Sequence, residues 1–434
     1  MAKPALVGGA GLEARLDAAA PPEGAAWITA ARKGARERLL KLGLPSRRDE
    51  YWRFTPPNAL TEPEPRASEA FEVDAPIFSD RDRVHLVFVD GVFDAEASDA
   101  LDLDEVVIER LETARSSDIH WASDVFGVLE ERGQAHVDRP LAALNTALAA
   151  DGMVIHVTGT PAKPIHIAYK QSAPNSDVVL HHCIKLDAGA ELTLLETGTA
   201  GARANTCLEV EIADRAALHH IRPQGRAPGR HGAHHVFARL GAEATFKSFT
   251  LAFDGRLSRN ESVVELLGDD AVVHLAGAFL GDGEDGKVHH DDTVFITHDA
   301  VNCESRQVFK KVLRAGSVGT FQGKILVKPG AQKTDGYQIS QSLLLDDDAQ
   351  FLAKPELEIY ADDVACSHGS TSGAIDETAL FYLRSRGVPL AEAQNLMVLA
   401  FLAEAIDEIE DEGLGGAVLD RLTAWLERYR GRRA

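Results

Sequence analysis

Cysteine is scarce in this sequence, and its few copies are not clustered. Cys183, Cys207, Cys303 and Cys366 are scattered over 434 residues, and no two of them form a Cys-x-x-Cys pair. This spacing argues against a disulfide framework, a zinc ribbon or a ferredoxin-type cysteine run. Long apolar runs are also missing, and residues 1–16 lack the charged start and apolar core of a signal peptide. We therefore expect a cytoplasmic protein.

Positive charge is in deficit, and familiar catalytic motifs are missing. The chain has 45 Lys and Arg against 67 Asp and Glu, which gives a net charge of −22. A nucleic acid or an anionic membrane would be repelled by this charge, so neither is an expected partner. The sequence contains no GxxxxGK[ST], GxSxG or HExxH motif. We therefore do not expect the chain to be a P-loop ATPase, an α/β-hydrolase or a zinc protease of these kinds.

What the sequence does contain is a long succession of short alternating strands, from Met153 to about Val364. No helical pattern interrupts it, and one phrase recurs: Gly or Asp, then Ala, then an apolar-polar run. Short strands at a repeating interval favour a mainly β fold of the β-helix (β-solenoid) type, with a large β-sandwich as the alternative. The early intervals between phrases are long and the late ones short. We therefore expect four strands in each long interval and two in each short one. The phrases begin near Gly189, Arg215, Gly241, Asp269, Asp299, Ala315, Pro329 and Asp347.

Helical patterns flank this region on both sides. Residues 25–42 read as an amphipathic helix, Val84 to Phe93 as a hairpin turning at Asp90-Gly91, and residues 121–150 as a second helical stretch. A C-terminal helix should start at Asp376-Glu377 and end at Gly387 and Pro389, before a helix with a broad apolar face over residues 391–409. The expected division is a mainly helical region with a strand pair (1–152), a β-helix core (153–375) and a C-terminal helical region (376–434).

Cys366 and His368 are the most prominent candidate ligands. They stand two positions apart at the end of a strand-like run, Lys354 to Gly373. On extended backbone both side chains project to one face, so a thiolate and an imidazole could bind one soft metal ion or a metal-sulfur cluster. They supply only two of the four ligands that a closed tetrahedral site needs. The other interpretation, a small buried cysteine beside a hydrogen-bonded histidine, stays open at this point.

Histidine and carboxylate pairs offer weaker alternatives. The four His-His dipeptides begin at His181, His219, His234 and His289. Strand neighbours point to opposite faces, so each dipeptide gives at most one ligand to a common site, and chance explains them equally well. Asp291-Asp292 and Asp346 to Asp348 could imitate the paired carboxylates of a carbohydrate-active lyase or hydrolase, which is the alternative function from another class.

Several longer motifs carry a resemblance to a known family. LEIYADDVACSHGSTSG (Leu357 to Gly373) and the block from Asp376 to Ile406 resemble the C-terminal part of the SufB/SufD family, scaffold subunits of the SUF iron-sulfur cluster assembly system. SRRDEYWRFTPPNAL (Ser46 to Leu60) looks like the aromatic N-terminal motif of that family, and PLAALNTALAADGMVIHV (Pro140 to Val157) is a further match. The Cys-Ser-His run and the FYLRSRG phrase favour the SufD branch, and a SufB paralogue is the narrower alternative.

The resemblance implies a right-handed parallel β-helix and a non-catalytic scaffold subunit of a SufBCD-type complex. It further implies a transient iron-sulfur cluster at an interface with a SufB-like paralogue, with His368 and Cys366 as its candidate ligands. A SufC-like ATPase would then dock on the C-terminal helices. Candidate contacts for that ATPase are Phe381, Leu383, Leu396, Leu399, Phe401 and Leu402.

Other properties of such a complex are not specified by the sequence. They include the cluster type, the sulfur donor, flavin use in the complex, the stoichiometry, and any ligand role of Cys183, Cys207 or Cys303. A homodimer of this chain in the absence of partners is a further open expectation.

Overall fold

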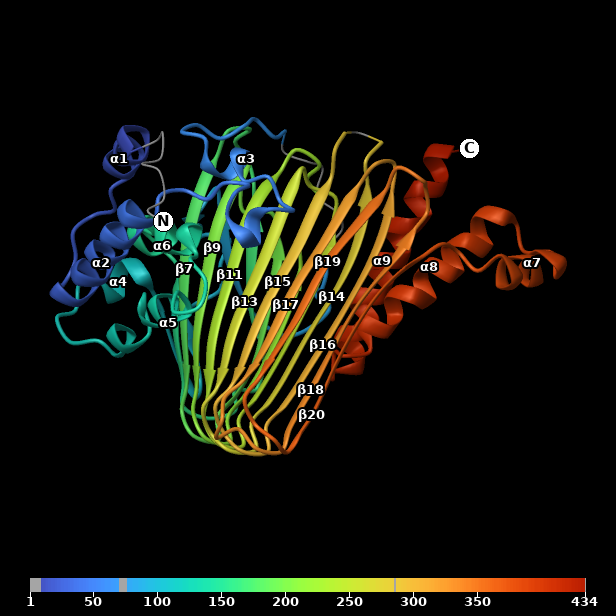
Figure 1. Cartoon of the computed structure of the whole chain (residues 1–434). Coiled ribbons are helices and arrows are strands. Elements are labelled where there is room, and N and C mark those ends of the chain that lie inside the picture. The colour runs from blue at the N-terminus through green and yellow to red at the C-terminus, as the bar shows by residue number, and fades with distance from the viewer. Residues whose placement is uncertain (1–8, 70–75, 285, 434) are drawn as a thin grey trace.

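The computed structural model describes residues 9–69, 76–284 and 286–433. Within these ranges the strands form two ten-stranded sheets, here called sheet A and sheet B. From β7 onward, the neighbours of each strand within its sheet are two positions away in the chain. Strands β5 to β20 alternate between the sheets and pair in parallel, so each turn of chain adds one strand to each sheet (Figure 1). This arrangement is a parallel β-helix of about eight turns. The expected mainly β fold with helical regions at both ends is confirmed.

The strands of the two sheets have the following bounds. Sheet A contains β6 (Ile165–Lys170), β8 (Glu191–Gly198), β10 (Ala217–Pro223), β12 (Thr245–Phe253), β14 (Val272–Asp282), β16 (Glu304–Arg314), β18 (Thr334–Leu344) and β20 (Val364–Gly373). Sheet B contains β5 (Met153–Val157), β7 (Asp177–Leu186), β9 (Arg203–Ile212), β11 (His231–Leu240), β13 (Leu257–Leu266), β15 (His289–His298), β17 (Val318–Val327) and β19 (Gln350–Ile359). At the N-terminal side, β1 (Val84–Val89) and β2 (Val92–Phe93) extend sheet A, and β4 (Val106–Arg110) and β3 (Asp102–Leu103) extend sheet B.

The recurring phrase marks the corners of the β-helix. Its first five copies, up to Asp299, all lie where a sheet B strand turns into a sheet A strand, so each interval spans one full turn with two strands. The copies at Ala315, Pro329 and Asp347 lie at alternate corners, with one strand between them. The expectation of four and two strands per interval was therefore wrong by a factor of two. At several of these corners the tight turn contains a residue with positive φ, as at Arg215 (φ 57) and Ala315 (φ 49).

The interior of the β-helix is filled by stacked rows of equivalent side chains. Because side chains alternate across a strand, every second residue points inward, and parallel register places equal positions of successive turns above one another. Leu186, Ile212, Leu240 and Leu266 form one such row on four successive strands of sheet B, and all are buried. These apolar rows explain why the strand pattern recurs along the sequence.

The β1–β2 hairpin at the edge of sheet A turns at Asp90-Gly91, as expected, with positive φ at both residues (48 and 81).

N-terminal segments cover the outer face of sheet B. Helix α6 packs on α2, β7 and β9, and α5 packs on β9 and β11 (Figure 1). The helical elements are α1 (Gly9–Ala18), α2 (Ala26–Leu42), η1 (Glu50–Trp52), α3 (Asn58–Thr61), α4 (Leu111–Ala114), η2 (Trp121–Asp124), α5 (Val128–Gly133) and α6 (Pro140–Leu148).

The C-terminal helices lie at the other end of the molecule. They are α7 (Glu377–Ser385), α8 (Leu390–Ile406) and α9 (Glu412–Arg433). Asp376 caps α7 by accepting hydrogen bonds from the backbone N–H groups of Thr378 and Ala379, and Gly387 (φ 86) follows the helix, as expected. Helix α8 packs on β14 and β16, whereas α7 projects beyond the β-helix (Figure 1).

A ladder of ion pairs also fastens the segment after α8 to the outer face of sheet A. His219, Lys247, His274 and Arg306 occupy the same register position on four successive strands. The first two pair with Glu410, and the last two with Glu408. Within the described ranges, no helix is both long and apolar enough to span a bilayer.

Candidate functional site

The last turn of the β-helix is an open end. Strand β20 is the outermost strand of sheet A and β19 that of sheet B, so each has one edge unpaired within the described chain. The run that contains Cys366 is split between them, because β19 ends at Ile359 and β20 begins at Val364 after a turn. Most side chains of β20 are exposed, unlike those of the equivalent strands below it. An exposed parallel edge of this kind can receive a strand from another chain.

Cys366 and His368 project from β20 into the interior row of this last turn. Cys366 lies beside Gly336 of β18, and it packs half-buried against an apolar group that includes Ile325. A Cβ atom on Gly336 would come within 3.1 Å of the Cys366 Sγ, so the glycine leaves room for the thiol. Burial raises the pKa of Cys366, and the neutral thiol is therefore favoured until a cation binds. His368 lies beside Gln338 and is exposed.

A polar floor lies beneath these two side chains. Gln338 and Gln307 are fully buried, and the Gln338 Nε2 donates to the Gln307 Oε1 at 3.0 Å. Two serine pairs continue the polar row toward β20, Ser340 with Ser370 at 3.1 Å and Ser342 with Ser372 at 2.9 Å. The sequence analysis missed this floor. Its signal was present in the alternation of β18, whose inward positions carry the amide and hydroxyl side chains of Gln338, Ser340 and Ser342.

The open end brings together two ligand-type residues, and no third joins them among the residues that the structure describes. Among the described residues, the one group of three side chains close enough to share a metal ion is His181, Cys183 and Glu209, which lies on β7 and β9. Five strand spacings separate β9 from β19, which corresponds to about 24 Å. Cys183 and Cys207 therefore cannot complete a site with Cys366. The fourth cysteine, Cys303, is also buried, and its Sγ contacts the Gly268 carbonyl oxygen at 3.3 Å.

The His-His dipeptides behave as strand geometry requires, with one ring inward and one outward. His290, for example, faces inward, where its Nδ1 lies 2.8 Å from the Lys311 Nζ, whereas the Nε2 of His289 contacts the Thr55 hydroxyl at 3.0 Å. Within the described chain, His181 alone among the dipeptide histidines belongs to a three-ligand group.

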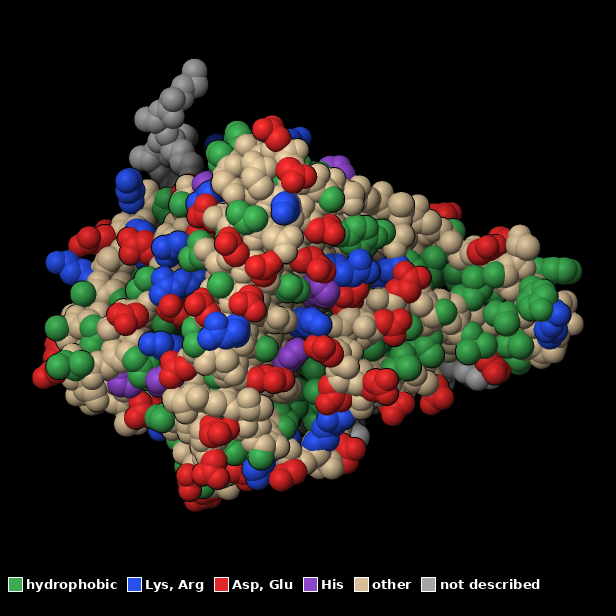
Figure 2. Space-filling view, turned by 90° about the horizontal axis from the view of Figure 1, so that it is seen from below, with side chains coloured by type: hydrophobic (Ala, Val, Ile, Leu, Met, Phe, Trp, Pro, Cys, Tyr) green, Lys and Arg blue, Asp and Glu red, His purple; other side chains and the backbone are tan. Residues whose placement is uncertain are grey.

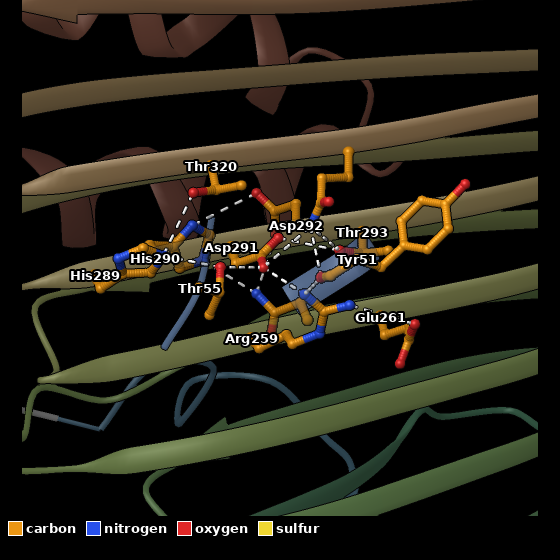
Figure 3. Close-up of polar contacts among 12 residues, drawn as sticks. Tyr51, Thr55, Arg259, Glu261, His289, His290, Asp291, Asp292, Thr293 and Thr320 are labelled. Carbon is orange, nitrogen blue, oxygen red and sulfur yellow. Dashed lines mark hydrogen bonds and ion pairs between the residues drawn. The ribbon is translucent and has the colours of Figure 1, made fainter. Parts of the chain in front are cut away.

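The carboxylate pair Asp291-Asp292 is split between the two faces of β15 (Figure 3). Asp291 accepts hydrogen bonds from Arg259 and Thr55, each at 2.5 Å, on the covered outer face. Asp292 pairs with Lys311 in the interior, also at 2.5 Å. Both carboxylates are buried and neutralised, so they do not form the facing pair that glycosidic chemistry needs. Asp346 instead accepts the backbone N–H of Ala315, as a corner residue.

Helices α7 and α8, here called the projecting helices, carry an exposed apolar surface. Phe381 on α7 is 74% exposed, and Leu396 on α8 is 46% exposed, with Tyr382 and Leu390 exposed nearby. Figure 2 shows hydrophobic side chains gathered over this end of the molecule. The other candidate contacts differ in burial: Leu383 is half-buried, Leu399 and Phe401 pack partly against sheet A, and Leu402 is completely buried there.

Comparisons with known proteins cover most of the chain. A family model for the SufBD core domain of the SUF system of FeS cluster assembly matches residues 169–401, and a model for the SufBD protein N-terminal region matches residues 19–166. The iron-sulfur cluster assembly protein SufD of Escherichia coli (strain K12) is 30% identical over 406 residues, which covers 89% of this chain and 90% of the relative. An iron-sulfur cluster assembly SufBD family protein of Synechocystis is 27% identical over 409 residues, covering 89% and 88%.

Proposed function

The chain belongs to the SufBD family of iron-sulfur cluster assembly proteins, and from this premise we propose that it is a non-catalytic scaffold subunit of a SufBCD-type complex. In this proposal the cluster is cargo. It is assembled at a site shared between the open end of this β-helix and a SufB-like partner, and is then passed to apo-proteins.

The incomplete ligand set at the open end is the observation that carries this proposal. Cys366 and His368 offer one sulfur and one nitrogen on one face of an edge strand, and the described part of the chain adds no third ligand there. Sulfur and imidazole ligands suit iron-sulfur centres, but two are too few to hold one. A partner whose edge strand meets β19 or β20 would supply the missing ligands. The polar floor of Gln307 and Gln338 gives the inner side of such a site hydrogen-bonding groups.

We assign the projecting helices to a SufC-like ATPase. The apolar side chains of Phe381 and Leu396 are exposed at the end that projects from the β-helix, where a second protein has access. Leu402 and Val398 bury the opposite face of α8 against sheet A, where α8 packs on β14 and β16. Displacement of α7, which packs on α8, would therefore act through α8 on the third and fourth strands from the open edge. A nucleotide-driven movement of the ATPase could therefore alter how the two β-helices meet.

Anaerobic co-expression with SufB-like and SufC-like partners tests the cluster site. We expect the wild-type complex to contain iron and acid-labile sulfide, and the chain expressed alone to contain little. His368→Ala should assemble the same complex but lose most of the cluster, because an exposed ligand is removed without disturbing the fold. Cys303→Ser, at a buried cysteine away from the open end, is the matched control and should retain cluster. An unchanged cluster content in both His368→Ala and Cys366→Ser would refute the shared site.

Co-purification tests the helical surface separately. Phe381→Asp should abolish retention of the ATPase while retention of the SufB-like partner persists. Ile119→Asp, at an exposed apolar residue on the N-terminal side, is the control and should retain both. Retention of the ATPase by Phe381→Asp at the wild-type level would contradict this assignment.

A further inference from the structure

A second set of ligand-type side chains lies near the other end of the β-helix. His181 and Cys183 are two positions apart on β7, and Cys207 and Glu209 are two positions apart on β9. The register pairs His181 with Cys207 and Cys183 with Glu209, so the four side chains form a two-by-two array on the outer face of sheet B. The corners of such an array lie about 5 Å apart across the strands and about 6.5 Å apart along them. All four residues are completely buried.

The ligand atoms of this array already converge. One ligand atom from each of His181, Cys183 and Glu209 lies within 4.8 Å of the other two. Ligand atoms around a tetrahedral zinc ion stand about 3.3 to 3.8 Å apart, given Zn–S and Zn–N bonds of about 2.3 and 2.0 Å. The Nε2 of His181 and the Oε2 of Glu209, at 2.8 Å, would separate slightly, and the thiols would move inward. The Sγ of Cys207 lies outside this group of three. A rotation of the Cys207 side chain toward His181, its partner in register, would bring it in as the fourth ligand, which gives two sulfurs, one nitrogen and one oxygen.

The surroundings hold these side chains in fixed positions. Glu209 accepts the backbone N–H groups of Gly127 at 2.5 Å and Glu130 at 2.6 Å, at the start of α5. The ring of Phe126 lies over the His181 imidazole, with 4.3 Å between centroids. Hydrogen bonds that orient a carboxylate ligand and apolar packing that excludes water are both typical of structural metal sites.

One further observation indicates a cation. Glu130, which is buried, is paired with Arg38 at 2.5 Å. No Lys or Arg among the described residues pairs with Glu209, whose contacts are His181 and two backbone N–H groups. A divalent ion would balance Glu209 together with two thiolates formed on binding.

We propose that His181, Cys183, Cys207 and Glu209 form a closed structural site for Zn²⁺, which fastens β7 and β9 to the start of α5. This site goes beyond the scaffold function, because it needs no partner chain and lies several turns away from Cys366 and His368. In the absence of a metal, the same contacts would amount to an ordinary His-Glu pair that caps α5.

Metal analysis of the chain expressed alone tests the proposal. All variants carry Cys366→Ser, so that the open end contributes no thiolate. After growth with added zinc and dialysis, we expect about one zinc ion per chain by plasma mass spectrometry. Growth with cobalt should give the absorption of thiolate-to-cobalt charge transfer. Cys183→Ala and Cys207→Ala should each lower the bound metal at least tenfold, whereas Cys303→Ala, at another buried cysteine outside the array, should leave it unchanged.

Two results would overturn the site. The first is a parent chain with less than a tenth of an equivalent of zinc, and the second is full zinc content in folded Cys183→Ala and Cys207→Ala. If those variants fail to fold, X-ray absorption at the zinc edge of the parent chain decides instead. A first shell with two sulfurs supports the site, and a shell of nitrogen and oxygen alone refutes it.

Discussion

The two ends of the β-helix use the same residue types in opposite settings. His181-x-Cys183 and Cys366-x-His368 both place an imidazole and a thiol on one face of a strand. The first pair lies on the outer face of sheet B, where N-terminal segments bury it completely. The second lies in the interior row, yet His368 is exposed because no further turn follows β20. Spacing thus decides which face a pair shares, whereas the covering segments decide whether it is closed or accessible to a partner.

Replacing a glycine by alanine should show the largest difference in stability between the covered and the open end of the β-helix. A Cβ atom on Gly152, next to β5 at the covered end, would come within 1.8 Å of the His181 carbonyl oxygen, and backbone cannot easily move there. We expect Gly152→Ala to lower the free energy of unfolding by about 4 kcal/mol. Gly369→Ala on β20 meets its nearest atom at 3.9 Å and should change it by less than about 0.5 kcal/mol. Urea unfolding followed by circular dichroism measures both, and equal effects would contradict the comparison.

A buried ion pair should show the next largest difference. Asp291→Ala removes the acceptor of Arg259 and Thr55 beneath the N-terminal segment (Figure 3). The buried guanidinium then keeps only Glu261, at 3.6 Å, as an acidic partner. Because Glu261 remains, the loss should lie at the lower end for a buried ion pair, and the free energy of unfolding should fall by about 3 kcal/mol. The control is Glu358→Ala on β19, whose pair with Lys324 faces solvent and should contribute less than about 1 kcal/mol. Comparable losses of stability in the two variants would show that ion pairs at the open end are no more solvated than those beneath the N-terminal segment.

Much of the fold could be predicted because its causes are local. Alternation, turn residues and a recurring corner phrase specify the strands, and Asp376 and Gly387 mark the ends of α7. The strand count per interval was wrong because most strands of the β-helix are about ten residues long, so an interval of one full turn holds only two. The domain boundaries at residues 152 and 375 stay predictions.

The site could be predicted only in part. Cys366 and His368 share a strand, so their common face follows from their spacing. The array of His181 and Cys207 joins two strands 26 positions apart, and the floor of Gln307 and Gln338 joins two strands 31 positions apart. Such juxtapositions depend on the register between turns, and no single segment of the sequence encodes that register.

Lowering the pH should reduce the stability contributed by the interior of the β-helix more than that contributed by its surface contacts. Burial lowers the pKa of His298 to about 4, whereas the unfolded chain has an ordinary value near 6.5. The unfolded state therefore binds the proton first as the pH falls, so stability is complete above about pH 6.5 and declines toward pH 4. One such histidine should account for about 2 kcal/mol of the loss between pH 7 and 5. His298→Gln should reduce this loss by that amount in urea titrations across the pH range.

His274 supplies a control of opposite sign for the acid prediction. Burial lowers its pKa, but hydrogen bonds with Glu408 and Glu304 outweigh burial, and the net shift is upward. Its contribution is therefore present at low pH and lost as the pH rises through the folded-state pKa. His274→Gln should make acid unfolding easier. The same direction of change for His298→Gln and His274→Gln would refute the assigned shifts.

The smallest expected effect on stability is at His368. This prediction decides whether a loss of cluster in His368→Ala can be interpreted as the loss of a ligand. His368 is exposed on an edge strand, so His368→Ala should change the free energy of unfolding by no more than about 0.5 kcal/mol. If the isolated chain meets this expectation, a loss of cluster from the assembled complex reports a missing ligand and not a damaged fold. A loss of about 2 kcal/mol or more in urea unfolding would instead show that His368 supports the last turn itself, because exposed side chains rarely contribute that much. In that case the difference between the covered and the open end would be one of degree, and Cys366 would remain as the candidate ligand at the interface.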